Sequence, residues 1–179
     1  MVNLIGKQAP IFTLKAIMPN KSVGNVALEP IKSAGKWTVL FFYPMDFTEV
    51  CPTEITAFSD RYDEFIDLNT EIIGVSKDTV ETHLKWINTD RFHNGVGQLA
   101  YPLAEDVQGE LAQLYRVYNE QEQLALRALF IISPDGELQY ESVFHYNIGR
   151  DIDEILRVLQ ALQTGGLCPA NWRPGDALL

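Results

Sequence analysis

Residues 37–54 read WTVLFFYPMDFTEVCPTE, and this stretch decides the fold. Its first seven residues are mostly apolar, aromatic or β-branched and end at Pro44, which predicts a strand buried on both faces. From Pro52 onward, apolar residues recur at spacings of three and four, which predicts a helix over residues 52–68. A strand that leads through a short loop into a helix is typical of an α/β protein, and here the loop delivers Cys51 to the helix start.

Strands and helices continue to alternate along the chain. Three further segments have the apolar, β-branched character of strands: residues 71–76, 129–132 and 138–144. Three others have the apolar spacing of helices: residues 80–89, 109–118 and 151–163. The turn at residues 133–136 joins the last two strands into a hairpin, and Gly165 ends the last helix. We therefore expect an α/β fold with helices on both faces of a central sheet.

The composition indicates one globular domain. The chain has 179 residues, 46% of them hydrophobic and 21% charged, so it can bury a sizeable core. Its net charge of −10 would repel a phosphate backbone, which argues against nucleic acid as a partner. No apolar stretch reaches membrane-spanning length, and the first residues lack the features of a secretory signal. We therefore expect a cytoplasmic protein without membrane contacts.

The two cysteines are more plausibly reactive than structural. Two cysteines and three histidines are scattered without C-x-x-C or H-x-x-x-H spacing, so we expect neither a metal nor another cofactor. Cytoplasmic cysteines rarely form structural disulfides. Pro52 suits the first helical position, and the dipole and free N–H groups of a helix start favour a thiolate at Cys51. Thr48 can offer a hydroxyl to the sulfur, and Pro44 can shield it from water.

Two other interpretations of Cys51 stay open on these grounds. Most free cysteines are inert members of a core, although a position at a strand–loop–helix junction argues against that. A cysteine protease would need a histidine base, and nothing in the sequence around His83, His93 or His145 marks one.

Longer motifs add a resemblance to a known family. The spacing Pro44-x-x-x-Thr48-x-x-Cys51 matches the signature of the peroxiredoxins. Similarity extends over nearly the whole chain, through four further motifs: HLKWIN at 83–88, RALFII at 127–132, NIGR at 147–150 and GGLCPANW at 165–172. The chain resembles the alkyl hydroperoxide reductase C/thiol-specific antioxidant branch, which is the typical two-cysteine type of bacterial thioredoxin peroxidase.

The resemblance implies a thioredoxin-like fold, with a central mixed sheet flanked by helices. Residues 1–164 would form the peroxidase domain, and residues 165–179 a tail. Cys51 matches the peroxidatic cysteine, which becomes a sulfenic acid, and Cys168 in the tail matches the resolving cysteine. The resemblance implies an interchain disulfide between them, whereas the residues alone leave intrachain and interchain bridges equally open.

Five other residues match positions around the family's nucleophile. Thr48 and Pro44 match its pocket partners, and Arg127 matches the arginine that completes the site. Glu54 and Arg150 match a supporting pair. Without the resemblance, Arg127 could be a solvated charge with a buried stem, and Glu54 could be a carboxylate that only favours the helix start.

The resemblance also implies a reaction and partners. The enzyme would reduce hydrogen peroxide and organic hydroperoxides, and thioredoxin or a flavoprotein disulfide reductase would recycle it. It would form a homodimer, with a decamer of five dimers as a larger assembly. An oligomeric holdase chaperone and a peroxide sensor or relay are the alternatives.

Glu49 departs from the family pattern. It stands where relatives usually carry an aromatic residue, next to the nucleophile. An unpaired carboxylate there would disfavour the thiolate. We therefore expect Glu49 to point into solvent or to pair with a basic group across a subunit contact.

Overall fold

The computed structural model describes residues 3–179. The chain divides into two compact units, Met1–Gly149 and Arg150–Leu179. The first unit contains the sheet and the loop that carries Cys51, and the second contains one helix and the segment that carries Cys168. Each unit is described by itself.

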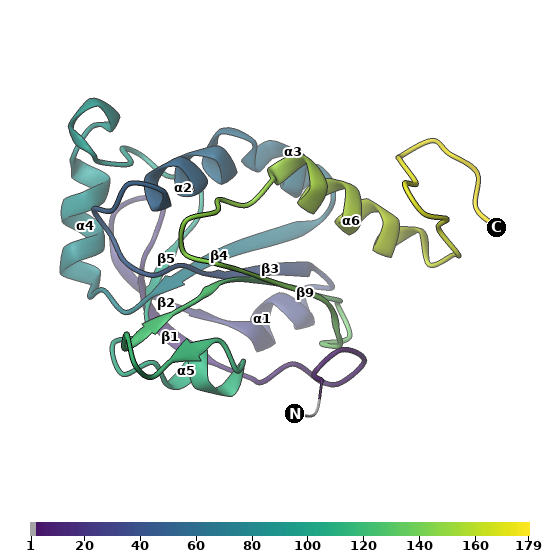
Figure 1. The fold of residues 1–179 in the computed structure, drawn as a ribbon, viewed down its shortest axis with the longest axis horizontal. Coiled ribbons are helices and arrows are strands. Elements are labelled where there is room, and N and C mark those ends of the chain that lie inside the picture. Colours follow the sequence, from purple (N-terminus) through teal and green to yellow (C-terminus); the bar gives the residue numbers. More distant parts are fainter. Residues whose placement is uncertain (1–2) are drawn as a thin grey trace. The chain divides into compact units, whose positions relative to one another are not determined.

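A seven-stranded mixed sheet organises the first unit (Figure 1). Its strands are β1 (Thr13–Ile17), β2 (Val23–Ala27), β3 (Trp37–Phe42), β4 (Thr70–Ser76), β5 (Leu103–Glu105), β8 (Arg127–Ile132) and β9 (Leu138–Phe144), in the order β2-β1-β5-β4-β3-β8-β9. The three central strands β5, β4 and β3 run parallel to one another, whereas β8 and β1 join them antiparallel on either side. A separate small hairpin pairs β6 (Tyr118–Asn119) with β7 (Leu124–Ala125).

Alternate residues of β3 pack into two different apolar layers, which is why the whole strand is apolar. Phe41 stacks on Phe58 of α2 (Cys51–Asp60), with 4.6 Å between the ring centroids. Phe42 points to the other face, where it meets Tyr115 at the end of α5 (Glu110–Leu114). The core on this second face also takes in Leu28, the first residue of α1 (Leu28–Ser33).

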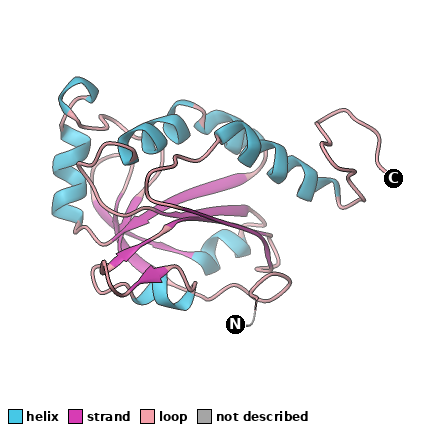
Figure 2. Cartoon of the chain, in the orientation of Figure 1, coloured by secondary structure: helices cyan, strands magenta, loops and turns pink. Residues whose placement is uncertain are grey.

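Figures 1 and 2 show helices on both sides of the sheet in the first unit, with α2 and α3 (Tyr62–Asp67) above it and α1 and α5 below it. Trp86 of α4 (Val80–Asn88) packs on Tyr43, which directly follows β3. Tyr43 lies on the same face of the sheet as Phe41. The 3₁₀ turn η1 (Arg91–His93) follows α4. The expected α/β fold with both sheet faces covered is confirmed.

Six of the eight elements with predicted bounds begin and end within two residues of them, but two helices differ. The helix predicted over 52–68 is wrong as a single element, because the backbone leaves the helical region at Arg61 (φ −113°, ψ 16°) and separates α2 from α3. Phe58 and Phe65 still pack together in the core, so the spacing of apolar residues does not indicate the break. The helix predicted over 109–118 shrinks to α5, and the chain turns at Arg116, where φ is +63°.

The second unit consists of α6 (Ile152–Thr164) and a segment without regular structure over residues 165–179. Asp151 caps the helix start, because its carboxylate accepts from the N–H groups of Asp153 and Glu154. Gly165 ends the helix in the left-handed region, with φ +66°. Within residues 3–179, no helix is both long enough and apolar enough to cross a membrane.

Candidate active site

Cys51 is the first residue of α2 and is fully buried. Strand β3 ends at Phe42, and the eight-residue loop 43–50 returns the chain to the sheet face that α2 covers. Pro52 takes one of the first helical positions, where a missing N–H costs nothing. The sulfur therefore lies at the positive end of a ten-residue helix, which favours a negative charge on it.

Strand pairing brings Arg127 to Cys51 although 76 positions separate them in the chain. Strand β8 runs antiparallel to β3 and pairs Ala128 with Phe42, so its first residue lies beside the carboxyl end of β3. There Nη1 of Arg127 lies 3.2 Å from the sulfur of Cys51. Its Nε donates to the backbone carbonyl of Tyr146 at 2.7 Å, which fixes the plane of the guanidinium.

Glu54 provides the counter-charge for this arginine. Its Oε2 accepts from Nη1 of Arg127 at 2.6 Å, and both side chains are almost completely buried. Glu54 lies three residues after Cys51 in the first turn of α2, so one nitrogen of the arginine contacts both the carboxylate and the sulfur. The alternative that Arg127 is a solvated charge is wrong, since only 3% of the residue is exposed.

Two residues of the loop before Cys51 were predicted to form its pocket. Pro44 is buried, and Thr48 is half-buried. The Thr48 hydroxyl donates to the carbonyl of Met45 at 3.2 Å, which leaves its oxygen able to accept a hydrogen bond from a bound molecule. Glu49 is exposed, so its carboxylate points into solvent, which was one of the two arrangements expected for it.

A buried polar cluster that the sequence did not reveal anchors this loop. Asp46 accepts from the Tyr43 hydroxyl at 2.8 Å, and its other oxygen lies 2.7 Å from Nδ1 of His83. Nε2 of His83 lies 3.2 Å from the carbonyl of Ala104, which can only accept, so this nitrogen carries a proton. The backbone N–H of Asp46 donates to Asp78, beyond the end of β4. Both nitrogens of His83 are thus engaged in structure, which removes it as a base for a cysteine protease.

Cys168 lies in the irregular segment of the second unit, as expected, and both cysteines are free thiols. Its sulfur lies 3.7 Å from the carbonyl of Ala161 and 3.5 Å from the Thr164 hydroxyl, both in the last turns of α6. Arg150 is buried and is the first residue of the second unit. Its predicted support of Glu54 stays a prediction.

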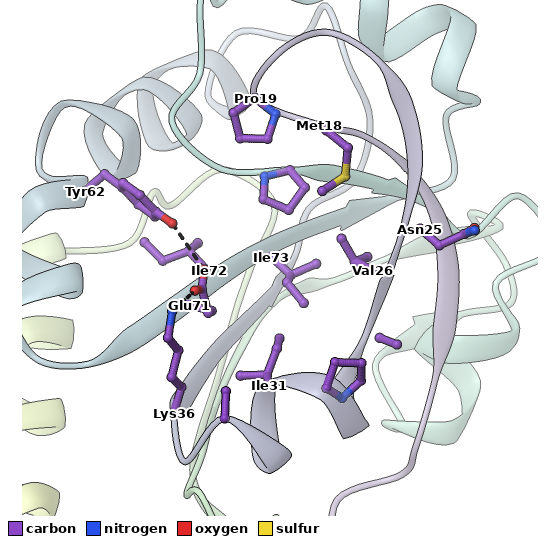
Figure 3. A pocket seen from close by; sticks show the side chains of 14 residues that line it. Met18, Pro19, Asn25, Val26, Ile31, Lys36, Tyr62, Glu71, Ile72 and Ile73 are labelled. Carbon is purple, nitrogen blue, oxygen red and sulfur yellow. Dashed lines mark hydrogen bonds and ion pairs between the residues drawn. The ribbon is translucent and has the colours of Figure 1, made fainter.

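A cavity of about 490 Å³ lies elsewhere in the first unit (Figure 3). Its walls are mainly apolar and include Val26, Ile31 and Ile73, while Glu71 at its edge binds Lys36 and Tyr62. Lys36 precedes β3 and Glu71 lies near the amino end of β4, whereas Cys51 follows the carboxyl end of β3 and does not line the cavity. The cavity is therefore separate from the cysteine site. Within residues 3–179, no group of three or more His, Cys, Asp or Glu side chains could hold a metal ion.

Cys51 is buried at a helix start next to Arg127, and the mixed sheet is covered on both faces. This combination is typical of thiol-dependent enzymes of thioredoxin-like fold. The model of the AhpC/TSA family matches residues 5–141, and the chain belongs to that family. The protein named "Putative peroxiredoxin YkuU" of Bacillus subtilis (strain 168) is 66% identical over 176 residues, 98% of each chain. The chloroplastic 2-Cys peroxiredoxin BAS1 of Hordeum vulgare is 46% identical over 177 residues, which cover 97% of this chain and 83% of BAS1.

Two solved structures show the same fold. The reduced 2-Cys peroxiredoxin of Plasmodium vivax superposes with a TM-score of 0.95 at 36% identity, covering 99% of this chain and 93% of its own. AhpC of Enterococcus faecalis gives a TM-score of 0.86 at 34% identity, covering 94% of this chain and 100% of its own. The protein is a peroxiredoxin, and thus a thiol-dependent peroxidase.

Proposed function

We propose that Cys51 is the peroxidatic cysteine and that Cys168 resolves its oxidised form. One observation carries the first assignment: the guanidinium of Arg127 lies 3.2 Å from a fully buried sulfur at the start of α2. Arginine stays protonated at any physiological pH, so it stabilises a thiolate without competing for its proton. A buried cysteine that served only for packing would not need a positively charged group at this distance.

The first step breaks the O–O bond of the peroxide. The Cys51 thiolate attacks one peroxide oxygen, and the other oxygen leaves with the bonding electron pair as hydroxide or alkoxide and takes up a proton. Arg127 stabilises the negative charge as it moves from sulfur to the leaving oxygen. The Thr48 oxygen accepts a hydrogen bond from the peroxide O–H and orients the substrate. Pro44 shields the sulfur from water, and Glu54 holds the guanidinium in place. We assign Arg150 a supporting role beside this group.

In the second step, the thiol of Cys168 attacks the sulfenic acid of Cys51, which forms a disulfide and releases water. We propose that the two cysteines belong to different chains of a homodimer, which can assemble further into a decamer. Thioredoxin or a flavoprotein disulfide reductase then restores both thiols by exchange. Residues 1–164 form the peroxidase domain and 165–179 the resolving tail. The enzyme works in the cytoplasm, where cysteines are kept reduced.

The relatives favour this function over the alternatives. The named relatives and solved neighbours are peroxiredoxins, and AhpC/TSA is the family that matches. A holdase chaperone would need neither cysteine, whereas a sensor or relay would need a stable mixed disulfide with another protein. The chaperone role does not call for an arginine at the sulfur.

Electrophoresis after one equivalent of peroxide tests the two cysteine roles together. The wild-type chain, run without reductant, is expected to give a band at about twice the chain mass. Cys51→Ser and Cys168→Ser are each expected to lack it, because either change removes one half of the disulfide. Persistence of the band in either variant, or an oxidised wild-type chain that stays monomeric in the gel, would contradict the interchain mechanism.

A further inference from the structure

The apolar cavity of the first unit lies where the sheet lacks part of a strand. Strand β4 pairs with β3 from Thr70 onward, whereas β5 pairs with β4 only from Gly74 onward. No strand within residues 3–179 therefore pairs with the first residues of β4 on the β5 side. The cavity beside them has walls from both sides of the sheet, including Ile31 of α1 and Tyr62 of α3 (Figure 3). It thus lies in the plane of the sheet, where a longer β5 would continue.

The backbone of Ile72 brings two hydrogen-bonding groups to this open edge. The N–H of Gly74 donates to the carbonyl of Pro102, so the backbone groups of Gly74 point toward β5. Residues two apart on a strand point their backbone groups the same way, so those of Ile72 face the same side. Pro102 precedes β5 and has no N–H to donate to the Ile72 carbonyl. Ile72 is completely buried and lines the cavity, so a bound molecule can supply the partners that its N–H and C=O require.

The remaining walls favour an uncharged molecule with apolar groups. Ile31 and Ile73 contribute hydrocarbon surface from the α1 side of the sheet. At the edge, one oxygen of Glu71 accepts from Nζ of Lys36, and the other accepts from the Tyr62 hydroxyl at 3.2 Å. The charge of this carboxylate is thus already compensated. The volume of about 490 Å³ lies within the range of small-molecule sites, about 300–1,000 Å³.

We propose that this cavity binds a small neutral amide, of the kind of a short peptide with blocked ends, which pairs with the backbone of Ile72. One extended amino-acid residue meets both groups of Ile72, because two facing residues of an antiparallel pair exchange both N–H···O bonds. Successive groups of an extended chain point to opposite sides, so they reach Ile31 on one side and Tyr62 on the other. Addition of an extended segment to an open strand edge is a recurring mode of peptide binding. Cys51 does not line this cavity, so the site is distinct from the peroxide site.

Calorimetry on the full chain with N-isovaleryl-leucine isobutylamide as the probe tests the proposal. This molecule has one amino-acid residue between two apolar caps, and it is expected to bind with a dissociation constant below about 1 mM. Hydrogen exchange, measured by mass spectrometry on the peptide that contains Ile72, is expected to slow about tenfold or more at saturation, because an amide gains an acceptor. The matched ester probe has oxygen in place of the leucine N–H. It is expected to bind about tenfold more weakly, because it cannot donate to the Ile72 carbonyl.

Two variants of α1 locate the binding site. Ile31→Trp places a larger side chain in the cavity and is expected to abolish binding and the slower exchange at Ile72. Ser33→Trp introduces the same side chain at an exposed position of the same helix, outside the cavity, and is expected to bind the probe as the wild type does. Both variants are expected to keep the wild-type rate of peroxide reduction, which also reports that they are folded.

Three results would each overturn the inference. The first is no saturable binding of the amide probe at about 1 mM. The second is equal affinity for the amide and the ester, because binding would then depend on apolar contact alone. The third is unchanged binding in a folded Ile31→Trp, which would place the probe elsewhere on the protein. If Ile31→Trp does not fold, the ratio of amide to ester affinity and the exchange at Ile72 still decide the outcome.

Discussion

Replacement of Arg127 by methionine is expected to lower the second-order rate constant for peroxide reduction by about a hundred- to a thousandfold. Arg127 is the cation next to the Cys51 sulfur, and it lies in a site from which water is excluded. Loss of a preorganised charge in such a site removes its whole stabilisation of the transition state, since no solvent dipole can replace it. Competition for peroxide against a second peroxidase of known rate gives the constant directly.

The same substitution is also expected to destabilise the fold, so the loss of stability has to be measured separately from the loss of rate. Methionine at Arg127 leaves Glu54 buried without this counter-charge, at a cost of several kcal/mol. The double variant Arg127→Met/Glu54→Gln removes both charges and is expected to recover stability but not rate. Arg116→Met, at an exposed arginine, serves as the control and is expected to match the wild type. A double variant that regains wild-type activity would show that Arg127 acts only through the fold.

Replacement of Asp46 by alanine is expected to lower the free energy of unfolding by about 2–6 kcal/mol, since two buried polar groups each lose a hydrogen-bond partner at about 1–3 kcal/mol. Asp46 is 5% exposed and binds both Tyr43 and His83 inside the protein. Its loss strands two polar groups that water cannot reach. Chemical denaturation beside Asp67→Ala, at an exposed aspartate, measures the effect. A loss below 1 kcal/mol would contradict the anchoring role of this cluster.

The contribution of Asp46 to the free energy of unfolding depends on pH. Burial raises the pKa of Asp46, and the hydrogen bond with His83 opposes the rise without cancelling it. Because this pKa is higher in the folded than in the unfolded chain, the folded state binds the proton more tightly. The resulting stabilisation is complete below the unfolded pKa, about 4, and is lost as the pH rises through the folded pKa. The stability of the wild type relative to Asp46→Asn is therefore expected to decline from acidic toward neutral pH.

The sequence was sufficient for the elements with a strong local signal. The unbroken apolar run of β3 predicts a strand between two cores, and Phe41 and Phe42 do pack on opposite faces. Pro52 predicts the start of α2, and the structure begins that helix at Cys51. The break at Arg61 escaped prediction, because one non-helical residue does not disturb spacings of three and four.

The site itself depends on contacts between distant segments, which spacing cannot show. No local pattern links Arg127 to Cys51, and the family motif alone suggested the pair before the structure placed them together. Nor does any pattern link Asp46 to His83, because 37 positions and several elements separate them. The helix start marked Cys51 as a candidate reactive thiol, and only the resemblance predicted its role as the nucleophile. The charges that surround it follow from strand pairing and packing.

The central claim is that peroxide oxidises Cys51, and mass spectrometry of the Cys168→Ser variant tests it most directly. In this variant Cys51 is the one remaining cysteine, so its sulfenic acid has no resolving partner in the chain. After one equivalent of peroxide and a sulfenic-acid trap such as dimedone, we predict a single adduct on the peptide that contains Cys51. Consumption of peroxide without any adduct or oxidation at Cys51 would contradict the account.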